Sequence, residues 1–146
     1  MALPTAADVY DGLVALWAAD ADLSAGIPTD RIYTTRDAER TDIPRAVIDV
    51  QDDSEERLVG RTVLVAFTAT VTVYDAHEPP RAGAVLTRVL KLFTGGGVDL
   101  AVDNATKVFP VRRLPGGTVA SARERVQGTE VASAAARLRV ACEAKR

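Results

Sequence analysis

The most regular feature of the sequence is an alternation of apolar and polar side chains over residues 61–75. A period of two is the period at which side chains alternate across a pleated strand. Threonine and tyrosine occupy the even positions from 68 to 74, and β-branched and aromatic residues fit a half-buried sheet surface. The pattern predicts one strand of roughly 45 Å, at about 3.3 Å per residue, on which the rest of the sheet is built. The apolar positions are Val63, Val65, Phe67, Ala69, Val71 and Val73.

Two segments have the spacing of amphipathic helices. The first begins at a cap formed by Thr5, with Asp8 three residues later, and ends near residues 20–23. The second follows Pro79 and Pro80 and runs to about Phe93, where the glycines at 95–97 end it. The apolar face of the first helix is expected to hold Val9, Leu13, Leu16 and Trp17, and that of the second Ala82, Val85, Leu86, Val89, Leu92 and Phe93.

The remaining segments predict shorter strands. Residues 52–57 form an acidic stretch that we interpret as the loop of an antiparallel hairpin between the second strand and the long one. The last segment alternates in the manner of a strand, although its alanines favour a helix equally by propensity. The order α-β-β-β-α-β-β-β predicts an α+β fold. Its mostly antiparallel, mixed sheet is built on a long central strand with two main helices packed on it. The predicted strands cover residues 30–34, 45–51, 61–75, 106–114, 118–127 and 130–143.

Composition narrows the class of protein. The 146 residues correspond to a single domain, 1–146, and the net charge of −2 disfavours non-specific nucleic-acid binding. The single cysteine, Cys142, cannot form an intramolecular disulfide. We see neither a membrane span nor a signal peptide, so we expect a soluble protein made and used inside a cell, or built into something assembled there.

The sequence offers little for catalysis or cofactor binding. His77 lacks a recognisable nucleophile or orienting partner nearby, and Cys142 reads as a buried structural thiol. One histidine and one cysteine exclude the usual zinc sets, and the acidic stretch lacks the spacing of a calcium loop. The glycines at 95–97 follow a helix, whereas a phosphate loop precedes one. We therefore expect no enzyme, no catalytic residue, no metal and no cofactor.

Arginines recur in pairs on the last three predicted strands. If those strands are neighbours, the arginines form a basic patch; the alternative is a solvated sheet face with Glu124 and Glu130 as partners. No aromatic residues interleave with them, which disfavours RNA, whereas arginine is common at protein interfaces. The candidate oligomer or tube interface is Arg112, Arg113, Arg123, Arg125, Arg137 and Arg139.

The order and spacing of these segments resemble the phage tail terminator, or tail-completion, family of siphophage-like tails. The resemblance rests on residues 16–23 at the end of the first helix, on Asp-Arg-Ile-Tyr at 30–33 and on Ile-Pro-Arg-Ala-Val-Ile-Asp at 43–49. It continues through the long strand, which ends in Val-Thr-Val-Tyr-Asp at 71–75, and through the second helix. The glycines at 95–97 and the arginine-rich end have no counterpart in the pattern.

The resemblance implies a structural role in the virion. Such proteins form a hexameric ring on the head-proximal end of the tail tube, stop its polymerisation and join it to the head connector. The implied partners are further copies of the chain, a tail tube protein and a head-tail connector protein, with DNA only as passing cargo and no membrane. The implied location is the tail or neck of a phage or prophage particle assembled in the bacterial cytoplasm. In such a ring, Asp52, Asp53, Glu55 and Glu56 would line the lumen, where negative charge keeps DNA from adhering.

Three alternatives stay open at this point. In the first alternative, the chain is a different head-tail neck protein. In the second, it is a small, dimeric cytosolic α+β domain with a ligand-binding or regulatory function. The third alternative, an enzyme with Asp49 or Asp75 as a base, ranks last because nothing else assembles around these carboxylates in sequence.

Overall fold

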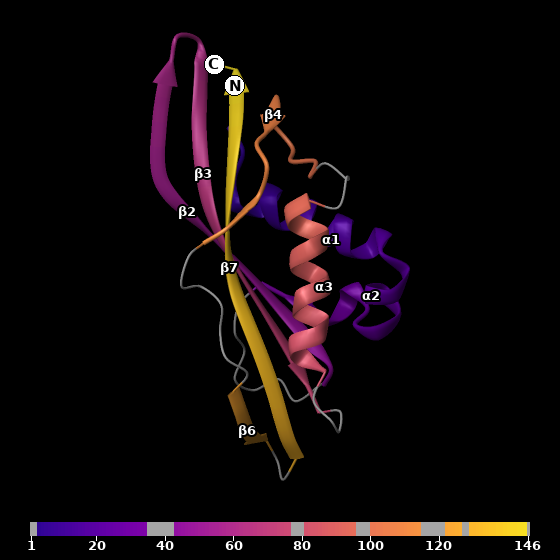
Figure 1. Ribbon diagram of the computed structural model, residues 1–146. Helices are drawn as coiled ribbons and strands as arrows, with labels where there is room; N and C mark the ends of the chain where they lie inside the picture. The colour runs from indigo at the N-terminus through magenta and orange to yellow at the C-terminus, as the bar shows by residue number, and fades with distance from the viewer. Residues whose placement is uncertain are drawn as a thin grey trace.

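Three long antiparallel strands cross the whole molecule and carry every other element (Figure 1). They are β2 (Arg45–Val59), β3 (Thr62–Asp75) and β7 (Thr129–Lys145). The computed structural model describes residues 3–34, 43–76, 81–95, 100–114, 122–126 and 129–145. His77 and the predicted turn at 115–117 lie outside these ranges.

Strand β3 is the centre of the sheet, as the alternation predicts. It pairs along its length with β7, from Thr62 opposite Lys145 to Asp75 opposite Ala132, and with β2 on its other side. The six odd apolar positions from 63 to 73 are at most 4% exposed, so one face of the strand is core throughout. The predicted long central strand is confirmed.

Three helices cover that apolar face: α1 (Ala6–Ala19), α2 (Ala21–Gly26) and α3 (Ala82–Gly95) (Figure 1). The start of α1 is the predicted capping box, in which the Thr5 hydroxyl accepts from the Asp8 N–H and the Asp8 carboxylate accepts from the Thr5 N–H. That backbone hydrogen bond lowers the pKa of Asp8. The core between the two layers includes Trp17 from α1, Phe67 from β3 and Val89 from α3, each fully buried.

The shorter elements extend the sheet on both sides. A 3₁₀ turn, η1 (Thr29–Arg31), leads into β1 (Ile32–Tyr33), which pairs in parallel with β2 and makes the sheet mixed. On the other side, β4 (Lys107–Val108), β5 (Arg112–Arg113) and β6 (Ala122–Val126) all pair with β7 in antiparallel register. The α+β class is therefore as predicted, and the element order agrees apart from an added helix and a divided strand.

The acidic stretch at 52–57 is a strand and not the loop that we expected. Strand β2 continues to Val59, with a register shift between Asp52 and Glu56, and the chain turns only at Gly60, where φ is +64°. Strand β1 pairs with β2 only at Ala46 and Val47. After these residues, β3 is the strand paired with β2 among the described strands, so this part of β2 is at the edge of the sheet. Edge strands tolerate charged residues because those residues discourage pairing with other chains. The prediction of a loop was therefore wrong because it relied on charge alone.

Two further differences have local causes. The predicted strand at 106–114 is split into β4 and β5, because Pro110 has no N–H to give to a ladder. A second helix, α2, follows α1 because Asp20 ends the first helix and caps the next, accepting hydrogen bonds from the N–H groups of Asp22 and Leu23.

Gly12 is where α1 approaches the segment after α3 most closely. A methyl group at this position would collide with the carbonyl oxygen of Ala101 and lie 3.1 Å from Cδ1 of Leu100. We expect Gly12→Ala to lower the free energy of unfolding by about 1–2 kcal/mol, because overpacking outweighs the gain in helix propensity. Gly83→Ala in α3 is the matched control, since nothing lies within 4 Å of its added methyl, and it should gain about 0.5 kcal/mol. Urea denaturation of both variants tests this, and an unchanged or more stable Gly12→Ala protein would contradict the packing described.

Candidate functional site

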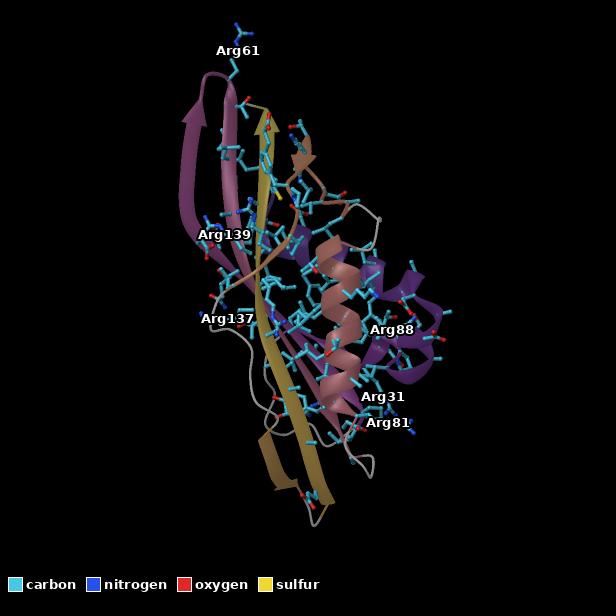
Figure 2. The ribbon with its side chains drawn as sticks, in the orientation of Figure 1. Arg31, Arg61, Arg81, Arg88, Arg137 and Arg139 are labelled. Atoms are coloured by element: carbon cyan, nitrogen blue, oxygen red, sulfur yellow. The ribbon has the colours of Figure 1, made fainter. Side chains whose placement is uncertain are left out.

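The sheet face away from the helices carries the most distinctive surface of the chain, which we call the outer face. Arg137 and Arg139 project from β7 on this side, away from α3 (Figure 2). A row of partly buried threonines on β3 runs along its middle. At one end, the outer face is covered by a small apolar cluster of Val47, Tyr74 and Val131. Arg45 is 6% exposed there and stacks over the Tyr74 ring at 4.6 Å. The threonines of the row are Thr68, Thr70 and Thr72.

One side of the outer face is acidic, and we call it the acidic border: Asp49 and Asp53 on β2. Asp49 lies opposite Thr70 in register and accepts hydrogen bonds from the Gln51 side chain at 3.1 and 3.2 Å. Asp52 is exposed but lies opposite the buried Phe67, on the helix side of the sheet. Asp53 accepts a 2.8 Å hydrogen bond from the Thr68 hydroxyl, which anchors that carboxylate to β3. Glu55 and Glu56, which complete the predicted acidic site, lie in the same strand.

The other side is basic, and we call it the basic border: Arg112, Arg137 and Arg139. Arg112 on β5 lies directly opposite Arg139 on β7, and like charges in that position destabilise a sheet. Arg139 lies 3.9 Å from Oδ2 of Asp53, an ion pair that reaches across β3. A hollow of about 260 Å³ opens between the two arginines, walled by Phe109 and Pro110.

The structure divides the six predicted arginines. Three form the basic border, whereas Arg113 lies opposite the core residue Leu138 and so belongs to the other side of the sheet. Arg123 and Arg125 lie opposite Ala132 and Glu130, at the far end of β7. Sequence spacing identified the strands that carry arginine but not the register that decides which arginines meet.

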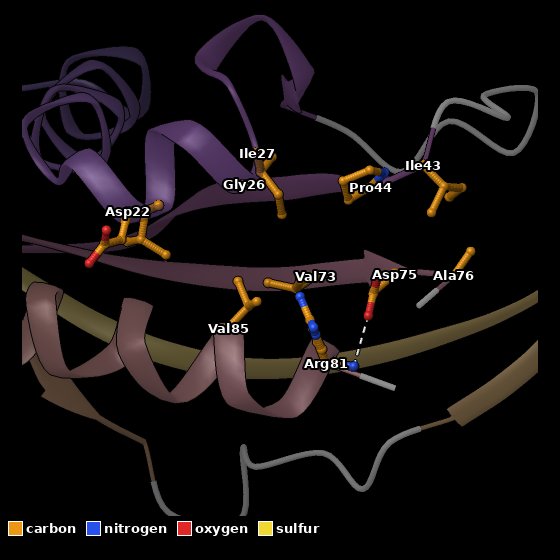
Figure 3. A pocket seen from close by; sticks show the side chains of 11 residues that line it. Asp22, Gly26, Ile27, Ile43, Pro44, Val73, Asp75, Ala76, Arg81 and Val85 are labelled. Atoms are coloured by element: carbon orange, nitrogen blue, oxygen red, sulfur yellow. Dashed lines mark hydrogen bonds between the residues drawn. The ribbon is translucent and has the colours of Figure 1, made fainter. Parts of the chain in front are cut away.

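A second feature is a groove of about 370 Å³ that the sequence did not reveal (Figure 3). Its walls come from α2, the residues just before β2, the end of β3 and the start of α3. They are mostly apolar, with Ile27, Val73 and Val85 among them. Asp22 lies at one end, while Asp75 and Arg81 lie at the other, where the Arg81 N–H donates to Asp75 at 2.7 Å. The charged groups therefore do not converge on one point of the groove.

An ion-pair cluster holds the α2 wall of this groove against α3. The Arg88 guanidinium donates to both carboxylate oxygens of Asp20 at 3.1–3.3 Å and lies 2.9 Å from Asp22. The pKa of Asp20 is lowered, first by the Leu23 N–H and then by Arg88. Because these groups are at the surface, the cluster orients α2 more than it stabilises the fold.

The described residues offer no assembled catalytic or metal centre. They contain no group of three or more histidine, cysteine, aspartate or glutamate side chains that could hold a metal ion. Asp49 and Asp75, the two carboxylates of the enzyme alternative, bond to Gln51 and to the Arg81 backbone respectively. Cys142 is fully buried, and burial raises the pKa of its thiol to about 11. No helix in the part of the chain described here is long and apolar enough to cross a membrane.

Comparison with known proteins is informative among solved structures. No protein-family model and no curated protein sequence matches the chain. Among solved structures, the fold is similar to that of a chain in the virion of a native gene transfer agent particle, with a TM-score of 0.62. The identity is 17%, and the similarity covers 96% of this chain and 95% of that chain. The likeness therefore shows a shared fold over essentially the whole of both chains.

Proposed function

We propose that this chain is a structural protein of a phage-like virion, and specifically the terminator that caps the head-proximal end of a tail tube. The observation that carries the proposal is the fold shared, over nearly the full length of both chains, with a chain of a virion particle. The segment order that resembles tail terminators supports the finer assignment. A neck protein one layer away is the nearest alternative.

The shape of the sheet suits a subunit of a ring. The β2–β3 hairpin and the end of β7 project well past the helices, so each subunit can reach its neighbours (Figure 1). The acidic and basic borders lie on the same face of the sheet, one on each side of β3. Two different surfaces that complement each other make a head-to-tail contact, and such contacts close into rings when the rotation allows.

The proposed role needs neither catalysis nor a cofactor. Its partners are other copies of the chain in a hexameric ring, the tail tube protein and the head-tail connector, in the neck of a virion assembled in the host cytoplasm. DNA passes through without being held. A lumen position for Asp52, Asp53, Glu55 and Glu56 stays a prediction, and normal DNA delivery after reversal of all four charges would contradict it.

Tube assembly in vitro tests the function. Tail tube protein from the same phage or prophage would be polymerised with and without the chain, and tube lengths measured by negative-stain microscopy. We expect elongation to stop at a ratio of about one ring per tube, because the cap acts only at the growing end. An unchanged length distribution at saturating protein would contradict the terminator assignment.

The apolar groove favours a second candidate, a dimeric cytosolic domain that binds a small ligand or regulates. A volume of about 370 Å³ falls within the range of ligand pockets. If this candidate is right, the chain forms a compact dimer that does not bind tube ends. An apolar ligand would then bind in the groove and raise the melting temperature of the protein. The tube assay separates the two candidates.

A further inference from the structure

The apolar groove between α2 and α3 has an excess of positive charge at one end. Arg81 lines that end, and its side chain extends from the start of α3 toward Val73 on β3 (Figure 3). Arg31 lies at the same corner of the molecule, where its Nη1 donates at 3.4 Å to the carbonyl oxygen of Pro44, another wall residue (Figure 2). Among the described residues, no carboxylate forms an ion pair with either guanidinium. This end of the groove therefore favours a negatively charged group.

The acidic residues of the groove do not balance these two arginines. Asp75 accepts the backbone N–H of Arg81 at 2.7 Å, where the carboxylate satisfies the N-terminus of α3. Asp22, at the other end of the groove, lies 2.9 Å from Arg88. The guanidinium of arginine is a planar fork of donors that matches a carboxylate, so a carboxylate from a partner is the expected complement.

The shape of the groove favours an extended protein segment over a small molecule. A small-molecule site holds a few polar groups that converge on one ligand, whereas the charged groups here lie at opposite ends of mostly apolar walls. A segment that lies along the groove can place apolar side chains against Ile27, Val73 and Val85 and a carboxylate on the arginines. Nucleic acid fits less well, because none of the described wall residues is an aromatic on which a base could stack.

We infer that the groove docks an apolar segment of the tail tube protein, and that an acidic residue of this segment pairs with Arg31 and Arg81. The inference rests on the proposed function, in which the tube end is the partner that capping requires. It gives the groove a different occupant from the small ligand of the second candidate. A segment docked there lies on the helix side of the sheet, so it leaves the outer face open to other contacts.

Peptide binding by the full-length chain tests this docking. Overlapping peptides that cover the tail tube protein and the head-tail connector of the same phage or prophage are immobilised and probed with the labelled chain. The dissociation constant of each bound peptide is then measured in solution by fluorescence anisotropy. Decanoate serves as the small-ligand probe, and its binding is measured by the shift in melting temperature.

One variant reverses the charge at the end of the groove, and its control changes charge equally elsewhere. The variant is Arg31→Glu with Arg81→Glu. The control is Arg61→Glu with Lys91→Glu, at exposed positions that are not part of the groove lining. Circular dichroism and melting temperature identify any variant that fails to fold.

A second variant fills the groove without changing charge. Gly26 lines the groove, and nothing lies within 4 Å of a Cβ added there, so Gly26→Trp has room for its side chain. Gly83→Trp is the matched control, because Gly83 is equally open but lies on the exposed side of α3 and is not part of the groove lining.

We expect the native chain to bind peptides of the tube protein that carry an acidic residue next to apolar ones. The double arginine variant should bind them about tenfold more weakly, because repulsion replaces attraction at two sites. Changing the acidic residue of the peptide to its amide should also weaken binding. Gly26→Trp should abolish binding, while both controls bind like the native chain.

Binding that survives Gly26→Trp, or that does not depend on the acidic residue, would overturn the inference. Binding of connector peptides or of decanoate in place of tube peptides would also overturn it, and decanoate binding would support the ligand-binding candidate. Native chain that caps tubes but binds no peptide would overturn the inference and leave the proposed function standing. Native chain that neither caps tubes nor binds peptides would overturn both.

Discussion

Trp17→Ala is expected to lower the free energy of unfolding by about 3–5 kcal/mol, the cost of removing a large buried aromatic side chain. Trp17 is fully buried in α1, and its indole N–H donates to the Ile27 carbonyl oxygen at 3.0 Å. The residue therefore supports the helix layer and also ties down the segment that follows α2. Urea denaturation followed by circular dichroism gives the measurement.

Trp17→Phe is the matched control. It keeps most of the aromatic packing but leaves the buried Ile27 carbonyl without its donor, so a loss of about 1–3 kcal/mol is expected. An alanine variant within 1 kcal/mol of the native chain would mean that α1 does not pack on the sheet as described.

The second prediction with a large expected effect concerns the chemical reactivity of the Cys142 thiol. Its thiol is fully buried and its pKa is raised to about 11, so at pH 8 little thiolate exists and none of it is exposed. We expect labelling by a thiol reagent to be at least 100-fold slower in the native protein than in urea, since a rise of two pKa units alone costs about 100-fold in thiolate. Comparable rates in both states would show that the end of β7 is not covered.

The raised pKa of Cys142 also makes the free energy of unfolding depend on pH. The folded pKa lies above the unfolded value, so the stabilisation is fully present below about pH 8.5 and is lost as pH rises through the folded value near 11. The loss attributable to Cys142 should reach about 2–3 kcal/mol, and it should be absent from Cys142→Ala. Denaturation of both proteins at pH 8 and pH 10.5 measures the difference.

The parts of the fold that follow from periodicity could be predicted. The alternation at 61–75 required a strand with one buried face, and the Thr5–Asp8 box fixed the start of α1. In the final segment the alternation outweighed the helix propensity of alanine, because β7 is paired with β3 along its length and buries its even positions from 132 to 144.

The parts that depend on register could not be predicted. The acidic stretch was expected to be a loop because charge usually accompanies loops, yet its place at the edge of the sheet lets β2 continue through it. Arg112 and Arg139 meet only because β5 pairs with β7 in one register, and Arg113, one residue away, faces elsewhere. The apolar groove is formed by four separate segments, so no local sequence pattern predicts it.

The measurement that tests the central claim most directly is cryo-electron microscopy of tail tubes mixed with the full-length chain, with averages computed for both tube ends. The account predicts a ring of six subunits on one end only. Tubes with two bare ends, or with the chain bound along their sides, would contradict it.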